Sequence, residues 1–235
     1  VEDVKPNVVD YIMPITKPSD LNITEYSLEN SYLFLKIENG TIYINGIKMS
    51  LVDFADLGDS YNFGPKSDDK GNELKILRSK VVLKTHLRAA LKVDFESVWD
   101  VVSATISLDR ASTSLSFKFD WVNSQKNHIL NAVFELNQPI QEVFSEDMNV
   151  LIKRNFDADY NIRENLPKIR GVEVKNNTAP MQRGLLIDEE NNNIGIVTKG
   201  LTQYEVYKNT LMLPILRATG VISNPQNPAR TTPAG

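Results

Sequence analysis

The chain has 235 residues, of which 41% are hydrophobic and 24% charged, and its net charge is −4. This composition is typical of a globular protein with a substantial core. It contains no stripe of lysine and arginine, so nucleic acid and anionic membranes are not expected partners. No apolar run approaches the ~18 residues of a membrane-spanning helix. The absence of cysteine excludes disulfides and thiol chemistry and favours a cytoplasmic location.

Residues 1–25 are interpreted as a linker or as the tail of a preceding domain. Pro6, Pro14 and Pro18 fall within them, and each proline removes a backbone donor and restricts the residue before it. The abrupt start indicates a fragment of a longer chain. Residues 26–235 are expected to form the folded domain.

From Ser27 onward, apolar residues recur at every second position, which is the period of β-strands. The pairs Asn39-Gly40 and Asn45-Gly46 separate the first of these runs. Asparagine and glycine tolerate positive φ, so such pairs predict tight hairpin turns of type I′. A polar loop containing aromatic residues follows at 57–65, and a charged loop follows at 66–73.

Long strands are predicted in the middle of the chain. The clearest spans 81–95 as one continuous strand, and further runs at 99–108, 114–121 and 130–136 complete an antiparallel meander. Long antiparallel sheets bury their faces by stacking, so the expected fold is all-β, a large antiparallel β-sandwich with long curved strands. An irregular excursion at 137–180, with one short strand at 150–152, precedes the last predicted strands at 184–187, 194–198, 204–207 and 211–217.

Few residues are candidates for catalysis or metal binding. His86, between Lys84 and Arg88, is interpreted as a solvated surface residue, and His128 as a hydrogen-bonded structural residue. Catalytic zinc normally takes three protein ligands, so no metal site is expected on this chain. No nucleophile elbow and no phosphate-binding glycine motif is present.

The loop at 57–65 has two interpretations. As a turn, its Asp and Asn side chains bond to nearby backbone, its glycines supply positive φ and its proline closes it. As a ligand-contacting loop, it presents Asp59, Tyr61 and Asn62 from a scaffold of strands. The residue types alone favour the turn.

Three segments, in this order, carry a specific resemblance. Residues 58–63 are Gly-Asp-Ser-Tyr-Asn-Phe, residues 200–206 are Gly-Leu-Thr-Gln-Tyr-Glu-Val, and residues 211–220 include Leu211, Leu213, Leu216, Arg217 and Gly220. They resemble the C-terminal β region of bacterial glycoside hydrolase family 38 α-mannosidases, with patterns Gly-Asp-X-Tyr-Asn-aromatic, Gly-Leu-X-Glu-Tyr-Glu-Val and Leu-X-Leu-X-Leu-Leu-Arg-X-X-Gly. Gln203 departs from the second pattern, where Glu is usual.

The resemblance implies a supersandwich of the galactose-mutarotase type over 26–235, incomplete at its C-terminal end. It also implies a non-catalytic portion of a retaining, zinc-dependent α-mannosidase that hydrolyses terminal α-mannosidic bonds. The zinc ion and the nucleophile are expected on an N-terminal α/β barrel, a part of the enzyme that this chain lacks, so no cofactor is expected here. The implied partners are that barrel and an α-mannoside oligosaccharide; a homo-oligomer is left open.

The resemblance also assigns site residues. Tyr61 is expected to contact mannose, with Asp59 and Asn62 as supporting hydrogen-bonding groups. Arg230 is a weaker candidate, because Arg230 with Ala234-Gly235 resembles only the start of a family loop. Two alternatives are a free-standing carbohydrate-binding β-sandwich and a mutarotase-like enzyme. The latter is disfavoured because it needs an acid and a base of its own.

Overall fold

A computed structural model describes residues 20–166, 175, 177–188 and 193–223. Every regular element in these ranges is a β-strand, and no helix that could cross a membrane occurs among them. The strands are β1 (Asn22–Ile23), β2 (Ser27–Glu29), β3 (Phe34–Glu38), β4 (Thr41–Ile44), β5 (Ile47–Ala55), β6 (Asn72–Glu73), β7 (Lys75–Lys84), β8 (Arg88–Glu96), β9 (Val101–Asp109), β10 (Leu115–Asp120), β11 (His128–Glu135), β12 (Glu142–Asp147), β13 (Val150–Asn155), β14 (Thr178–Pro180), β15 (Gly184–Ile187), β16 (Ile194–Val197), β17 (Gln203–Tyr207) and β18 (Thr210–Ala218).

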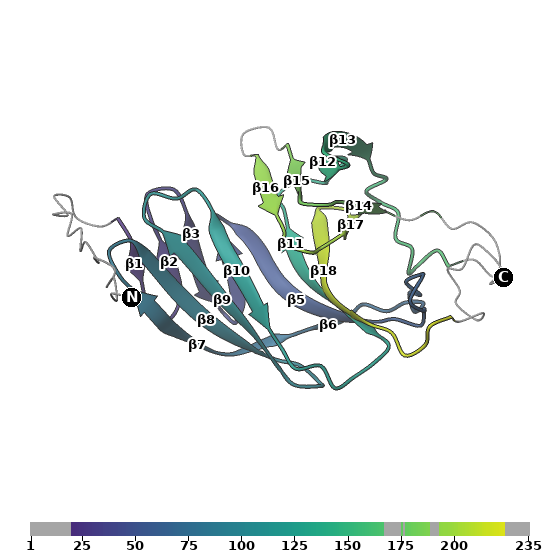
Figure 1. Cartoon of the computed structure of the whole chain (residues 1–235), viewed down its shortest axis with the longest axis horizontal. Helices are drawn as coiled ribbons and strands as arrows, with labels where there is room; N and C mark the ends of the chain where they lie inside the picture. The colour runs from purple at the N-terminus through teal and green to yellow at the C-terminus, as the bar shows by residue number, and fades with distance from the viewer. Residues whose placement is uncertain (1–19, 167–174, 176, 189–192, 224–235) are drawn as a thin grey trace, which may run out of the picture.

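One large sheet organises the domain. Its strand order is β1-β2-β3-β4-β5-β11-β18-β17-β14, with β6 paired to β5. Two four-stranded sheets, β10-β9-β8-β7 and β13-β12-β15-β16, accompany it. Figure 1 shows the first of these across β1–β3 and the second at the opposite end, near β14 and β17. The predicted all-β antiparallel sandwich is therefore confirmed.

The main core lies between the large sheet and the two smaller ones. In β5, Met49 and Leu51 point into it, while Val52 and Phe54 point to the opposite, outer face. Leu51 is directly opposite Ala132 of β11 in the ladder, and Ala132 is opposite Leu213 of β18. Fully burying a side chain of this size stabilises the fold by about 1.5–3 kcal/mol, so period-two alternation fixes which face of each strand is inside.

The two Asn-Gly pairs form the tight turns that the sequence predicts. Asn39 and Gly40 have φ of 51° and 75°, and Asn45 and Gly46 have φ of 48° and 89°. Both residues of each pair lie in the left-handed region, as a type I′ turn requires. These turns set the register of β3, β4 and β5 and so bring β5 to the centre of the large sheet.

The prediction of one continuous strand over 81–95 is wrong. The chain turns at residues 85–87 and forms a hairpin of β7 and β8. The Thr85 N–H donates to the Arg88 carbonyl at 3.0 Å, and the Thr85 hydroxyl accepts from the Arg88 N–H at 2.9 Å. A threonine hydroxyl makes this turn without glycine or proline, so the alternating pattern runs through it unbroken.

Two further predictions need correction. The run at 130–136 was expected to continue the meander, but β11 inserts between β5 and β18 in the large sheet. The meander itself consists of β7, β8, β9 and β10. Within the described part of the excursion at 137–180, where one short strand was expected, the structure has β12, β13 and the three-residue β14. Alternation indicates that a strand exists, but contacts between residues distant in sequence determine which strand pairs with it.

Candidate functional site

The loop at 57–65 leaves the end of β5, and the buried carboxylate of Asp56 organises its backbone. Oδ1 of Asp56 accepts hydrogen bonds from the N–H groups of Gly58 and Gly64, both at 2.9 Å. The Leu57 N–H donates to the Gly64 carbonyl at 2.7 Å. A Cβ on Gly64 would lie 2.3 Å from the backbone nitrogen of Gly58. The two ends of the loop therefore touch, and glycine is required for that approach.

Arg217, near the end of β18, holds the same loop from a second strand. Its Nε donates to Oδ2 of Asp56 at 2.7 Å, and its Nη2 donates to the carbonyls of Asp59 and Asn62 at 2.6 and 2.7 Å. A guanidinium presents its donors in a rigid planar fork. One side chain therefore fixes a carboxylate and two backbone carbonyls at once.

The three predicted residues of the loop occupy different environments. Asp59 is buried, and its Oδ1 accepts from the N–H groups of Tyr61 and Asn62 at 3.0 and 2.9 Å. Asn62 is partly buried and binds Arg217 through its carbonyl. Tyr61 has 71% of its surface exposed. Asp59 and Asn62 thus shape the turn, and Tyr61 is the residue that the loop presents outward.

A second contact ties the loop to the segment that follows β18. The Ser60 hydroxyl donates to the Ile222 carbonyl at 2.6 Å, and the Ser60 N–H donates to the same oxygen at 3.2 Å. Asn127 joins this junction, because its carbonyl accepts from the Asp56 N–H and its Oδ1 from the Gly220 N–H. The remaining predicted site residue, Arg230, lies outside the described residues.

A polar cluster lies between the large sheet and the β7–β10 sheet, on the other side of β5. His128 Nδ1 is 2.8 Å from Oδ1 of Asp53, and His128 Nε2 is 3.1 Å from Oδ1 of Asn123. The indole N–H of Trp99 donates to Oδ2 of Asp53 at 3.0 Å. This geometry fits the hydrogen-bonded structural role predicted for His128. His86 is exposed on the turn between β7 and β8, as a surface residue would be.

Among the residues that the structure describes, no group of three or more His, Asp or Glu side chains could hold a metal ion. The resemblance places its zinc ion on the catalytic barrel, and the described residues of this chain offer no donor set for one.

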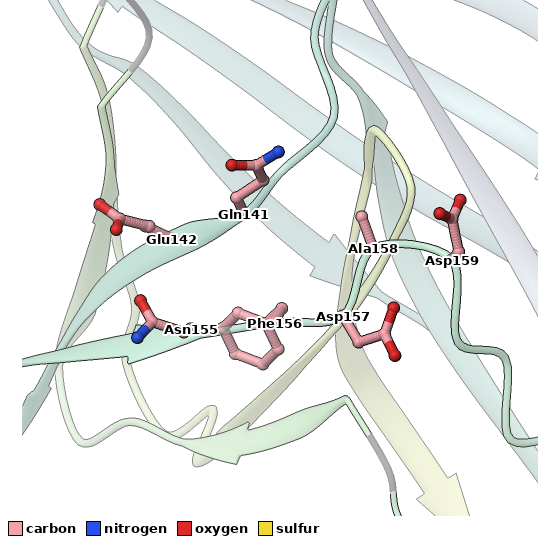
Figure 2. Close-up of a pocket in the computed structure, with 7 residues that line it drawn as sticks. All are labelled: Gln141, Glu142, Asn155, Phe156, Asp157, Ala158 and Asp159. Carbon is pink, nitrogen blue, oxygen red and sulfur yellow. The ribbon is translucent and has the colours of Figure 1, made fainter.

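An open hollow of about 450 Å³ lies between the start of β12 and the end of β13. Figure 2 shows Gln141 and Glu142 on one side of it and Asn155 to Asp159 along the other. Two of its carboxylates are already paired, Glu142 with Lys153 at 2.7 Å and Asp157 with Lys175 at 2.5 Å. The hollow contains no residue of the 57–65 loop.

Sequence reasoning missed the residues that hold the loop. Asp56 directly follows a strand in which most residues are apolar, and Arg217 occurs in the last strand where neighbouring residues are apolar. A charge in such a position signals a buried partner, since buried charges are paired. That signal identifies both residues as unusual but does not reveal that they meet, because 161 positions separate them.

Comparisons with known proteins bear on the fold. No protein-family model and no curated protein matches the sequence. The solved structure of an α-mannosidase from Enterococcus faecalis V583 is similar, with a TM-score of 0.71 and 16% identity over 85% of this chain and 26% of that one. A glycosyl hydrolase family 38 protein from Enterococcus faecalis gives a TM-score of 0.69 and 15% identity over 85% of this chain and 27% of that one. The chain thus spans about a quarter of each structure, and the resemblance to this family is confirmed at the level of the fold.

Proposed function

We propose that this chain is the β-sandwich portion of a glycoside hydrolase family 38 α-mannosidase and that it presents Tyr61 to the sugar-binding pocket of the complete enzyme. The observation that carries the proposal is the fold match over 85% of this chain to about a quarter of an α-mannosidase. The Gly-Asp-X-Tyr-Asn-aromatic pattern of the loop supports it independently. Its implied partners are the catalytic barrel of the same polypeptide and an α-mannoside.

In this proposal Tyr61 binds substrate and does not break the glycosidic bond. A phenol hydroxyl donates one hydrogen bond and accepts others, which matches a sugar hydroxyl, and its ring can pack on a sugar face. Asp59 and Asn62 act through the backbone geometry that they hold. Such preorganisation lowers the entropic cost of orienting the substrate. The catalytic carboxylates and the zinc ion belong to the rest of the polypeptide, so the chain alone is inactive.

The test compares Tyr61→Phe with wild type in the complete polypeptide, using a chromogenic aryl α-mannoside. We expect kcat/KM to fall by the equivalent of about 1–3 kcal/mol, because one hydrogen bond in a desolvated site is lost. Tyr32→Phe is the matched control, since Tyr32 is also exposed (59%) and precedes β3; its kcat/KM should not change.

Three outcomes contradict the proposal. A wild-type kcat/KM for Tyr61→Phe means that the loop is only a turn. Hydrolysis by the isolated chain, with or without added zinc, means that catalytic groups lie on the chain itself. The complete polypeptide could also bind mannosides and hydrolyse none of them. That result favours the alternative, a carbohydrate-binding module.

A further inference from the structure

A buried ion pair lies on the outer face of the large sheet, close to the loop at 57–65. Arg163 donates from Nη1 and Nη2 to the two carboxylate oxygens of Glu205, at 2.6 and 3.2 Å. Their side chains are 6% and 15% exposed. Glu205 belongs to β17, so this bidentate contact fixes the guanidinium plane relative to the large sheet.

The same guanidinium packs against two aromatic rings, one just before the loop and one within it. Its central carbon lies 4.4 Å from the centre of the Phe54 ring and 5.5 Å from the centre of the Phe63 ring. Phe54 is the penultimate residue of β5, and Phe63 lies within the loop, two residues after Tyr61. Arginine stacks favourably on aromatic faces, so Arg163 is in contact with the end of β5 and with the loop that follows it.

The segment that carries Arg163, residues 157–166, is itself well anchored. The backbone N–H of Arg163 donates to Oδ1 of Asn161 at 2.9 Å, and the side-chain amide of Asn177 donates to the backbone carbonyl of Asp157 at 2.6 Å. The Arg163 carbonyl accepts from the Asp68 N–H at 3.2 Å, just beyond the loop. Arg163 therefore connects its own segment to β5, to β17 and to the loop.

We propose that Arg163, held by Glu205, is a positioning residue for the loop that carries Tyr61. A buried ion pair adds little net stability over apolar residues of similar size. Its effect here is geometric, since the fixed guanidinium plane places the Phe63 ring and, through it, Tyr61. The consequence for catalysis rests on the proposed function; the consequence for loop order does not.

The test replaces the pair as a unit, with the double variant Arg163→Met/Glu205→Met, which leaves no unpaired buried charge. We expect amide hydrogen exchange at Tyr61 and Asn62 to become roughly tenfold faster, because a locally destabilised loop opens more often. In the complete polypeptide, kcat/KM should fall about 3–10-fold, mainly through KM. Lys36→Met/Glu38→Met, which removes an exposed pair on β3, should change neither quantity.

Arg163→Lys is a second variant, in case the double variant does not fold. It keeps the charge but loses the planar fork, so loop exchange should again rise. The proposal is overturned if a folded Arg163 variant shows the same amide exchange in the loop as wild type. It is also overturned if such a variant exchanges faster but keeps the wild-type kcat/KM, while Tyr61→Phe lowers kcat/KM. If Tyr61→Phe has no effect, the proposed function fails, while loop exchange still decides whether Arg163 positions the loop.

Discussion

The loop depends most directly on Asp56, and Asp56→Asn tests that dependence with almost no change of shape. The carboxylate accepts three hydrogen bonds, two from backbone N–H groups at 2.9 Å and one from Nε of Arg217 at 2.7 Å. An amide keeps one acceptor oxygen and replaces the other with an NH₂ group. That group would face the Arg217 donor, so one donor must lose its partner.

The size of the effect follows from these contacts. A hydrogen bond to a charged group contributes about 1.5–3 kcal/mol, and an unsatisfied buried donor costs about 1–3 kcal/mol. The Arg217 side chain is 23% exposed, so water offsets part of the loss. We therefore expect Asp56→Asn to lower the free energy of unfolding by about 2–4 kcal/mol, a large part of the 5–15 kcal/mol typical of a domain.

Urea unfolding followed by tryptophan fluorescence, with linear extrapolation to water, measures this change. Asp120→Asn is the matched control, because Asp120 pairs with Lys118 on the surface, where the two side chains are 52% and 74% exposed. Surface pairs contribute little, so the control should stay within about 0.5 kcal/mol of wild type. A loss of less than about 1 kcal/mol for Asp56→Asn would refute the reasoning, since the three bonds would then not determine the loop.

Two further predictions concern stability. Gly64→Ala should lower the free energy of unfolding by about 1–3 kcal/mol through overpacking. Gly195→Ala is the control and should have a stability close to that of wild type, because nothing lies within 4 Å of the new Cβ. Equal effects of the two substitutions would contradict the close approach at Gly64. Burial acts to raise the pKa of Asp94, but hydrogen bonds from Ser103 and Arg78 outweigh it and lower the pKa from its ordinary 3.8. A lowered pKa stabilises the fold above the unfolded value and loses that effect as pH falls through the folded value. Acid should therefore destabilise wild type more than Asp94→Asn between pH 5 and pH 2, measured by urea unfolding at each pH; parallel curves would contradict this.

The strands were predictable because alternation is a local property. A strand with one buried face must place apolar residues at every second position, and a type I′ turn must use residues that tolerate positive φ. The runs at 184–187, 194–198, 204–207 and 211–217 correspond to β15 to β18 for this reason. The turn after Lys84 was missed because a threonine hydroxyl made it. The apolar alternation also continues through the turn, although Val81 and Leu83 of β7 are exposed while Ala89 and Leu91 of β8 are buried.

The candidate site was predictable only in part. Tyr61 was selected by a resemblance to a short pattern, and the structure shows it exposed on its loop. The same pattern contains Asp59, whose carboxylate accepts a backbone hydrogen bond within the turn. Arg163 carried no local signal, and Glu205 was noticed only as part of the 200–206 pattern. Neither residue was expected to be buried, because a charged residue at an irregular or alternating position usually faces water.

By itself, then, the sequence determined that the domain is a sandwich of antiparallel strands with a polar, aromatic loop after its first hairpin. These features depend on interactions between residues close in the chain. Only the tertiary structure decided that β11 lies between β5 and β18, and that Arg217 and Arg163 reach the loop from other strands and segments. The reason is physical. A buried carboxylate or a stacked ring requires a partner, but the fold determines which distant residue is that partner.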